Sequence, residues 1–312
     1  MKTDRRFTRW MSVFLAALLI SPVLPGGALG ETTGQAPAKA FSQEQLDQLL
    51  APIALYPDSL LTQILMASTY PLEVAKANSW AKQNKELKGD ALTAALEKQD
   101  WDPSVKSLVN FPQVLQMMTD KLDWTEKLGD AFLAQQKDVM DTVQKLRAKA
   151  YEAGNLKSGK EQTVSVDDAT KIIVVESANP QVVYVPTYNP TVVYGVWWYP
   201  AYPPYYVYPA PYAGAAFFTG VAVGVAWGYA WGHCNWHGGN VNINYNQNIN
   251  VNRNIDRGRY AQPYQGRGGI DSSGRGTWQH DPGHRGGVAY RDNATAQKYG
   301  QGTARATLAG RQ

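Results

Sequence analysis

Apolar side chains between residues 41 and 160 recur at intervals of three and four positions, the spacing of one face of an α-helix. Ser42 and Gln45 form a capping-box pattern at the start of this region. Two Tyr-Pro steps, at Tyr56-Pro57 and Tyr70-Pro71, interrupt the periodicity and restart it. The pattern therefore predicts several short helices that begin at prolines.

The longest helix is expected at residues 130–152. Its apolar stripe has helical spacing and consists of Phe132, Val139, Val143, Leu146 and Ala150. We expect this stripe to pack on helices of the same chain. A partner helix in another chain, as in a chaperone or assembly factor, is the alternative interpretation.

Beyond residue 160 the pattern changes to short β-branched runs, which predict two to four strands. A six-residue unit, Asn-Pro-x-Val-Val-Tyr, occurs at residues 179–184 and again at 189–194. Because proline fixes φ and its predecessor favours extended geometry, we expect each copy to form a turn and then a strand. The predicted fold class is α+β: a helical N-terminal domain with a small β-hairpin or sheet element, and then a low-complexity, largely disordered C-terminal half.

Three strings carry a family resemblance: Leu50–Asp58 (LAPIALYPD), Ile64–Val74 (ILMASTYPLEV) and Tyr184–Gly195 (YVPTYNPTVVYG). They resemble an uncharacterised family of exported proteins of Gram-negative bacteria, the domain of unknown function 3300, over about residues 45–195. The resemblance implies a location in the cell envelope. It implies no activity and no catalytic residue.

The composition shifts divide the chain into five expected segments. They are a signal peptide at 1–30, a helical plus small β domain at 41–195, a Pro/Tyr/Trp-rich linker at 196–212, a Gly/Ala-rich apolar segment at 213–232, and an Asn- and Arg/Gly-rich tail at 233–312. We expect the linker to pack along its own domain. An aromatic surface for glycan, lipid or a protein partner is the alternative.

The apolar segment carries glycines at every fourth position: Gly220, Gly224, Gly228 and Gly232. On a helix these residues share one face, and small residues at this spacing let two membrane helices pack closely. The segment therefore predicts membrane association, with a low-complexity glycine-rich chain as the alternative.

Asparagine then occupies every second position, at Asn240, Asn242, Asn244, Asn246, Asn248, Asn250, Asn252 and Asn254. Period two places them on one face of an extended strand. No neutral partner strand is obvious in the sequence, so pairing between chains is the β-assembly hypothesis. A disordered polar tract is the alternative.

The four histidines form two pairs of equal spacing, His233 with His237 and His280 with His284. On a helix each pair would present two imidazoles to zinc or copper. Neighbouring glycines and prolines disfavour such helices, so no cofactor is expected and metal binding is the alternative. Asp58 and Glu73 follow Pro57 and Pro71, where capping and helix-dipole roles are expected rather than catalysis.

Charge and cysteine content restrict the class of protein further. Residues 1–30 carry +3 of the net charge of +4, in front of a short apolar run and a small-residue cleavage site before Glu31. This is the layout of a secretory signal peptide. One cysteine excludes an internal disulfide framework and a multi-cysteine metal site.

We therefore expect a protein exported to the periplasm or cell envelope, and a structural or interaction protein rather than an enzyme. Membrane or envelope components and other copies of the chain are the expected partners, and nucleic acid is not. The rival interpretation is an envelope enzyme that acts on cell-wall material or uses a metal at the histidines. The absence of histidine between residues 41 and 160 disfavours the enzyme.

Overall fold

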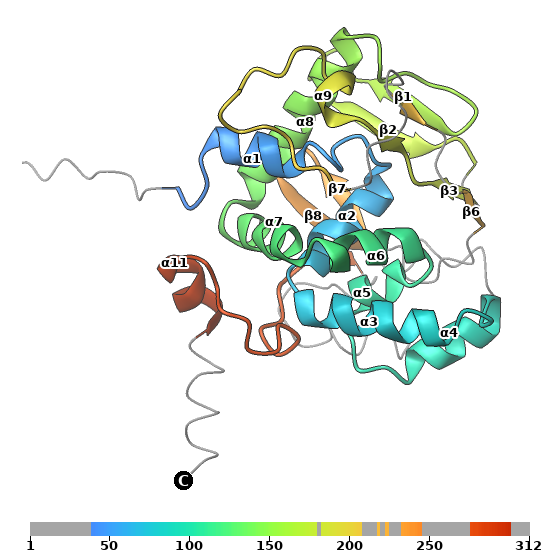
Figure 1. Cartoon of the computed structure of the whole chain (residues 1–312). Coiled ribbons are helices and arrows are strands. Elements are labelled where there is room, and N and C mark those ends of the chain that lie inside the picture. The colour runs from blue at the N-terminus through green and yellow to red at the C-terminus, as the bar shows by residue number, and fades with distance from the viewer. Residues whose placement is uncertain are drawn as a thin grey trace, which may run out of the picture. The chain divides into compact units, whose positions relative to one another are not determined.

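The structure is a computed structural model, and it describes residues 39–179, 182–207, 217–218, 222–224, 232–244 and 275–300. All of these residues fall within one compact unit, Lys39–Gln312 (Figure 1). The predicted signal peptide at 1–30 lies outside the described residues.

Eight helices follow one another in the first part of the described chain. They are α1 (Gln43–Leu50), α2 (Asp58–Ser68), α3 (Pro71–Gln83), α4 (Gly89–Glu97), α5 (Pro103–Leu108), α6 (Pro112–Asp120), α7 (Leu122–Ala134) and α8 (Gln136–Glu152). The capping box at Ser42 and Gln45 is present, and Pro71, Pro103 and Pro112 each occupy the first helical turn. The expectation of short helices that begin at prolines is confirmed.

The predicted helix at 130–152 is wrong in its first part. The chain breaks at Gln135, whose φ of −142° and ψ of 50° are not helical, so α7 ends at Ala134 and α8 begins at Gln136. The apolar stripe nevertheless lies inside this chain, since Phe132, Val139, Val143, Leu146 and Ala150 are all buried in its core. These five side chains are therefore not available to a partner helix.

Small antiparallel sheets complete the fold. The strands are β1 (Gln162–Val166), β2 (Ile173–Ser177), β3 (Val182–Tyr184), β4 (Thr187–Tyr188), β5 (Phe217–Phe218), β6 (Ala222–Gly224), β7 (Gly232–Asn235), β8 (Asn240–Asn244) and β9 (Arg275–Thr277). Strand β1 pairs with β2, β3 with β6 and β4 with β5, while β7, β8 and β9 form a three-stranded sheet in that order. The predicted α+β class, helical with small antiparallel sheets, is confirmed.

The two copies of the Asn-Pro repeat differ in structure. In the first copy Val182–Tyr184 is strand β3, as expected. In the second copy Pro190–Val193 is the short helix α9, so the expectation of a second strand is wrong. The Asn189 side chain accepts a hydrogen bond from Thr191 N, and Pro190 at the first helical position needs no N–H partner, so the same motif can serve as an N-cap.

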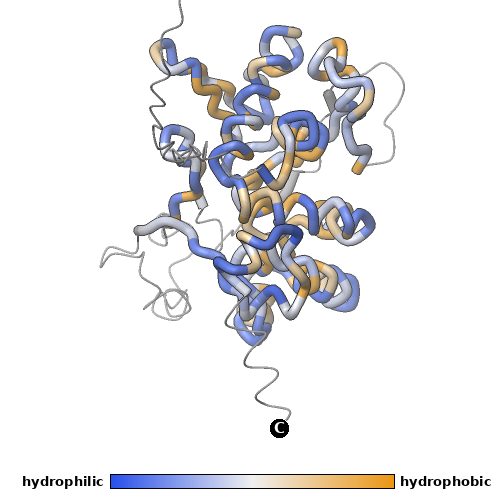
Figure 2. The backbone as a smooth tube through the Cα atoms, turned by 90° about the vertical axis from the view of Figure 1, so that its left-hand side faces the viewer, coloured by the Kyte–Doolittle hydropathy of each residue, from blue (hydrophilic) through white to orange (hydrophobic). Residues whose placement is uncertain are grey.

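The sheet β7–β8–β9 packs against the helices with alternate residues of β8. Val241 and Ile243 are buried in the common core, whereas Asn242 faces outward. Figure 2 shows that the helices likewise carry both hydrophobic and hydrophilic positions. One continuous core therefore connects the helices to strands from the C-terminal part of the chain.

The last described segment contains α11 (Asn293–Thr295) and the π-helix η2 (Ala296–Gly300). Before them, the loop at 278–292 reaches back to the helices: Arg285 is buried and bonds the Asp130 carboxylate of α7 at 2.7 Å. Within the part of the chain that the structure describes, no helix is both long and apolar enough to cross a membrane.

Candidate functional site: a pocket of lysines and aromatic rings

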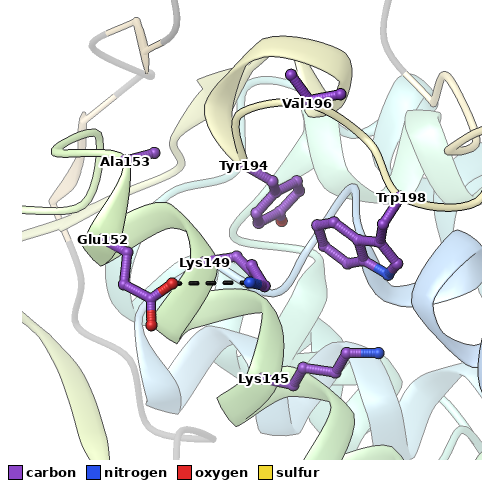
Figure 3. Close-up of a pocket in the computed structure, with 7 residues that line it drawn as sticks. All are labelled: Lys145, Lys149, Glu152, Ala153, Tyr194, Val196 and Trp198. Atoms are coloured by element: carbon purple, nitrogen blue, oxygen red, sulfur yellow. Dashed lines mark ion pairs between the residues drawn. The ribbon is translucent and has the colours of Figure 1, made fainter.

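A pocket of about 470 Å³ lies between the second half of α8 and the chain that follows α9. Figure 3 shows the seven residues that line it: Lys145, Lys149, Glu152, Ala153, Tyr194, Val196 and Trp198. A helix therefore supplies the charged side chains and the Pro/Tyr/Trp tract supplies the rings. We refer to this feature as the lysine–aromatic pocket.

Asp47 of α1 lies beneath the lysine–aromatic pocket and binds two of the side chains that line it. Its carboxylate is buried, pairs with Lys145 Nζ at 2.7 Å and accepts a hydrogen bond from Trp198 Nε1 at 2.7 Å. Lys145 Nζ also lies 5.4 Å from the centre of the Trp198 ring. Because a buried carboxylate needs such partners, the positions of Lys145 and Trp198 are strongly determined.

Lys149 and Glu152 are held much less tightly. Their charged groups are 3.7 Å apart, and their side chains are 46% and 67% exposed. An exposed pair of this kind contributes little to stability, so both groups can exchange partners with a ligand. Val196 at the edge of the pocket is 93% exposed.

Tyr194 anchors the aromatic side of the pocket to the core. Its hydroxyl donates to the carbonyl of Ala51 at 2.5 Å, and Tyr188 donates to the same carbonyl at 2.9 Å. Burial raises the pKa of both phenols above the ordinary value, so they remain neutral donors. The string Leu50–Asp58 thus accepts hydrogen bonds through its backbone carbonyls. The carbonyls of Ala54 and Tyr56 accept from the buried Arg147.

The described part of the predicted linker at 196–212, residues 196–207, packs along the helical domain as expected, and residues 208–212 lie outside the described residues. Tyr205 N donates to the carbonyl of Gln48 in α1, and Gln48 in turn donates to the carbonyl of Pro203. In Figure 1 this yellow segment runs beside α1. The two interpretations of the linker are therefore compatible, because the packed tract also presents aromatic rings in the pocket.

Histidines of the C-terminal segment contact the helical region at 41–160, which contains no histidine itself. His284 Nδ1 lies 2.7 Å from a Glu73 carboxylate oxygen of α3, and its Nε2 lies 3.6 Å from Asp281. The hydrogen bond to Glu73 raises the pKa of His284, and burial raises the pKa of Glu73. Glu73 thus hydrogen-bonds Nδ1 of His284, whereas Nε2 makes only the longer contact with Asp281.

His280 lies at the start of the same helix, but it contacts aromatic side chains instead of a carboxylate. Its ring stacks on Tyr70 at 5.2 Å, and its Nε2 is 3.0 Å from the Tyr290 hydroxyl. Burial lowers the pKa of His280 to about 3, so the ring is neutral at physiological pH. Within a ten-residue stretch the chain thus carries one histidine that favours the charged form and one that favours the neutral form.

Neither histidine pair lies on a helix in the structure. His233 is in β7 and His237 in the following turn, while His280 and His284 are in the loop after β9. Among the described residues, no three His, Cys, Asp or Glu side chains are placed to hold a metal ion.

Asp58 and Glu73 lie in the first turns of α2 and α3, where a carboxylate suits the helix dipole. Neither helix has a side-chain capping hydrogen bond, so the expected capping role is wrong. Each also holds a distant segment. Asp58 pairs with Arg147 at 2.6 Å and accepts from Trp236 Nε1 at 2.9 Å, and Glu73 accepts from Asp102 N at 2.7 Å. Nothing in the local pattern of the sequence predicts these contacts, because the partners lie 29 to 178 positions away.

The glycine and asparagine series are only partly described. Gly220 and Gly228 lie outside the described residues, whereas Gly224 ends strand β6 and Gly232 begins strand β7, so the helix expected at these two positions is wrong. A Cβ atom at Gly232 would lie 2.9 Å from Met66 Cε of α2. At this position the need for a small residue comes from packing on a helix of the same chain.

Asn240, Asn242 and Asn244 lie on strand β8, in agreement with the period of two. This strand has partners within the chain on both sides, β7 and β9, so the expected lack of a partner strand is wrong for these three residues. Asn246, Asn248, Asn250, Asn252 and Asn254 lie outside the described residues.

The fold and the pocket together define an α+β protein with a compact helical core and a surface site of lysines and aromatic rings. The chain matches the family described as "Protein of unknown function (DUF3300)" over residues 42–280 and belongs to that family. It is 48% identical over 200 residues to the uncharacterized protein YacH of Escherichia coli strain K12. That match covers 54% of this chain and 32% of the relative, and no solved structure matches significantly.

Proposed function

We propose that this protein is exported to the cell envelope and acts there without catalysis, by binding envelope saccharide in the lysine–aromatic pocket. The observation that carries the proposal is the composition of the pocket, in which Trp198 and Tyr194 lie beside Lys149 and Glu152. Ligand sites combine apolar walls with a few placed polar groups in this way. The signal-like layout of residues 1–30 supports the envelope location.

Charge balance favours a saccharide over an anionic lipid headgroup. The ammonium groups of Lys145 and Lys149 face the carboxylates of Asp47 and Glu152, so this set of four groups is neutral. A lipid phosphate would favour a net positive site. A sugar presents an apolar C–H face to a ring and hydroxyl groups that both donate and accept, which suits Trp198 beside Lys149 and Glu152.

The non-enzymatic part of the proposal rests on the histidines. His284 is engaged by Glu73 and Asp281, and His280 is buried against Tyr70 and Tyr290. Both histidines fasten the C-terminal segment to α3. Neither is among the residues that line the lysine–aromatic pocket.

The test is calorimetric titration of the purified protein with soluble glycan strands released from cell-wall peptidoglycan. We expect saturable binding that Lys149→Gln and Glu152→Gln each weaken by about tenfold, the effect of one hydrogen bond to a charged group. Lys137→Gln is the matched control, because Lys137 also lies on α8 in an exposed ion pair, with Asp141, but outside the pocket. Equal affinity of Lys149→Gln and Lys137→Gln would contradict the proposal.

A further inference from the structure

The exposed hydrophobic side chains of the described residues are concentrated in one segment. The large ones are Leu72, Tyr151, Val192, Val196, Tyr202 and Tyr206, and four of these six lie between residues 192 and 206. No Asp, Glu, Lys or Arg occurs within that segment. Single exposed hydrophobic residues are ordinary, whereas a concentration of them on one short segment indicates an interaction surface.

This segment forms a closed surface loop, residues 191–206, which we refer to as the aromatic loop. At its ends, the Tyr206 hydroxyl donates to Thr191 Oγ1 at 3.2 Å. Across its middle, Trp197 Nε1 donates to the carbonyl of Tyr202 at 2.9 Å. Loops whose ends are close and whose own side chains fill them are compact and are frequently functional.

The aromatic loop is also fastened to helix α1. Gln48 Nε2 donates to the carbonyl of Pro203 at 2.6 Å, and Tyr205 N donates to the carbonyl of Gln48 at 3.3 Å. Tyr202 and Tyr206 flank this anchored stretch, and both are exposed. Because their backbone is already held, a ligand that packs on these two rings has little conformational entropy to offset.

The aromatic loop continues directly from the lysine–aromatic pocket. Three of the residues that line the pocket, Tyr194, Val196 and Trp198, belong to the loop. The ring of Trp197 stacks on that of Trp198 with their centres 4.5 Å apart, and the same indole binds the backbone of Tyr202. A ligand longer than the pocket can therefore extend from Trp198 onto the exposed rings of the loop.

The side chains of the aromatic loop suit sugar units better than lipid. A segment that lies in a membrane surface combines Leu, Phe or Trp with many lysines and arginines. The loop contains none of these except Trp197 and Trp198, which are partly buried and stack on each other. Its exposed rings are tyrosines, which offer an apolar face to the C–H groups of a sugar and a hydroxyl to its oxygens.

We propose that the lysine–aromatic pocket and the aromatic loop form one extended site for a linear saccharide chain of several units. One unit occupies the pocket, and the units that follow pack on the rings of Tyr202 and Tyr206. This inference rests on the proposed function, since it takes the ligand of the pocket to be a saccharide. It adds that the ligand is a polymer and that residues outside the pocket contribute to its affinity.

The test compares two lengths of cell-wall glycan strand, a disaccharide and an octasaccharide, in calorimetric titrations of the full chain. We expect the octasaccharide to bind about tenfold more tightly, because its additional units cover the rings of Tyr202 and Tyr206. The double variant Tyr202→Ser/Tyr206→Ser should lower the affinity for the octasaccharide to that for the disaccharide. It should leave the affinity for the disaccharide unchanged.

Three further variants serve as controls. Tyr151→Ser removes an exposed tyrosine of α8 that does not line the pocket, and it should leave both affinities unchanged. Tyr202→Phe keeps the ring and should retain the tighter binding of the octasaccharide. Lys149→Gln should weaken the binding of both lengths.

The outcomes separate this inference from the proposed function. Equal affinity of the parent for both lengths, with binding still weakened by Lys149→Gln, would overturn the extended site and leave the pocket in place. Absence of binding at either length would overturn both. An equal loss of octasaccharide affinity in Tyr151→Ser and in the double variant would also overturn the role of the loop.

Phosphatidylcholine vesicles test the competing occupant of the aromatic loop. We expect the full chain to remain in solution when such vesicles are sedimented. Sedimentation with the vesicles that the double variant Tyr202→Ser/Tyr206→Ser abolishes would assign the loop to a lipid surface and overturn the proposal.

Discussion

Buried arginines carry the contacts that join distant parts of this chain. Arg147 of α8 is fully buried and bonds the carbonyls of Ala54, Tyr56 and Ile173 as well as the Asp58 carboxylate. One guanidinium therefore connects the segment before α2 to strand β2. The planar, multiply donating group suits this position in a way that a lysine would not.

We expect Arg147→Met to lower the free energy of unfolding by about 3–5 kcal/mol, because it leaves Asp58 and several carbonyls without their partner. Denaturant unfolding followed by circular dichroism measures the change. Lys137→Met, at an exposed position on the same helix, is the control and should change stability by less than about 0.5 kcal/mol. A similar small effect for both would show that Arg147 is not structurally required.

The His284–Glu73 pair predicts a dependence of stability on pH. The pKa of His284 in the folded state is raised by Glu73, so its contribution is complete below the unfolded value of 6.5 and is lost as pH rises through the folded pKa. The pKa of Glu73 is also raised, so its ionisation acts in the same direction at lower pH.

His280 opposes this dependence in the parent, because its lowered pKa makes stability rise with pH up to its unfolded value. We therefore expect the difference in free energy of unfolding between the parent and His284→Gln to shrink as the pH increases above 6.5. Unfolding midpoints in urea at several pH values measure it. A difference that stayed constant with pH would show that the titration does not belong to His284.

At the scale of elements, helices α2 and α7 are in close contact at Gly129. A Cβ atom at this position would lie 2.2 Å from the carbonyl oxygen of Ser68, which is backbone and cannot move aside cheaply. At Gly232, by contrast, the nearest atoms are ends of side chains from α2. An added methyl group is therefore tolerated less well at Gly129 than at Gly232.

Gly129→Ala should destabilise the protein by about 1–3 kcal/mol, although alanine is the better helix former, because the added methyl group overpacks the α2–α7 contact. Gly232→Ala should cost less, since Met66 and Gln63 can shift. Thermal unfolding of both variants gives the comparison. A stabilised Gly129→Ala variant would contradict the close approach.

Local chemistry explains which elements could be predicted from the sequence. Proline positions, the Ser42–Gln45 box and the alternation at Val241 and Ile243 indicate helices and a strand that the structure contains. The break at Gln135 and the helix α9 could not be predicted, because apolar spacing continues across the break and the Asn-Pro motif fits both a turn and an N-cap.

The candidate sites were less predictable than the fold. The sequence indicated an aromatic tract, but its partners Lys145 and Lys149 precede it by about fifty residues. The histidines were noted as a spaced pair, whereas their structural partners are Glu73 and Tyr70, more than two hundred positions away. Such pairings arise from tertiary packing, and the spacing of residues along the sequence does not predict them.

At the scale of the whole molecule, the C-terminal segment 275–300 is part of the folded core. It supplies strand β9, the buried Trp278 and the Arg285–Asp130 pair. A chain that ends at residue 274 should lose about 3–5 kcal/mol or more of stability, because it lacks the buried Trp278 side chain as well as these contacts. A chain that ends at residue 300 keeps these contacts and is the matched control in a thermal unfolding experiment. Equal midpoints would contradict the packing.

Export is also a property of the whole molecule. We expect the protein isolated from the envelope fraction of expressing cells to begin at Glu31, as the small-residue site before it predicts. N-terminal sequencing checks this position. Recovery of an intact N-terminus from the cytosol alone would contradict the proposed location.

The most direct test of the central claim, saccharide binding in the envelope, is photocrosslinking in living cells from Val196, the highly exposed residue at the edge of the lysine–aromatic pocket. A photoreactive amino acid replaces Val196 in one strain and Lys137 in a control strain, and both are fractionated after irradiation. The account predicts an adduct from position 196, in the envelope fraction, that a glycan hydrolase releases and that Lys149→Gln diminishes. Adducts of equal yield from both positions, or adducts that resist the hydrolase, would contradict it.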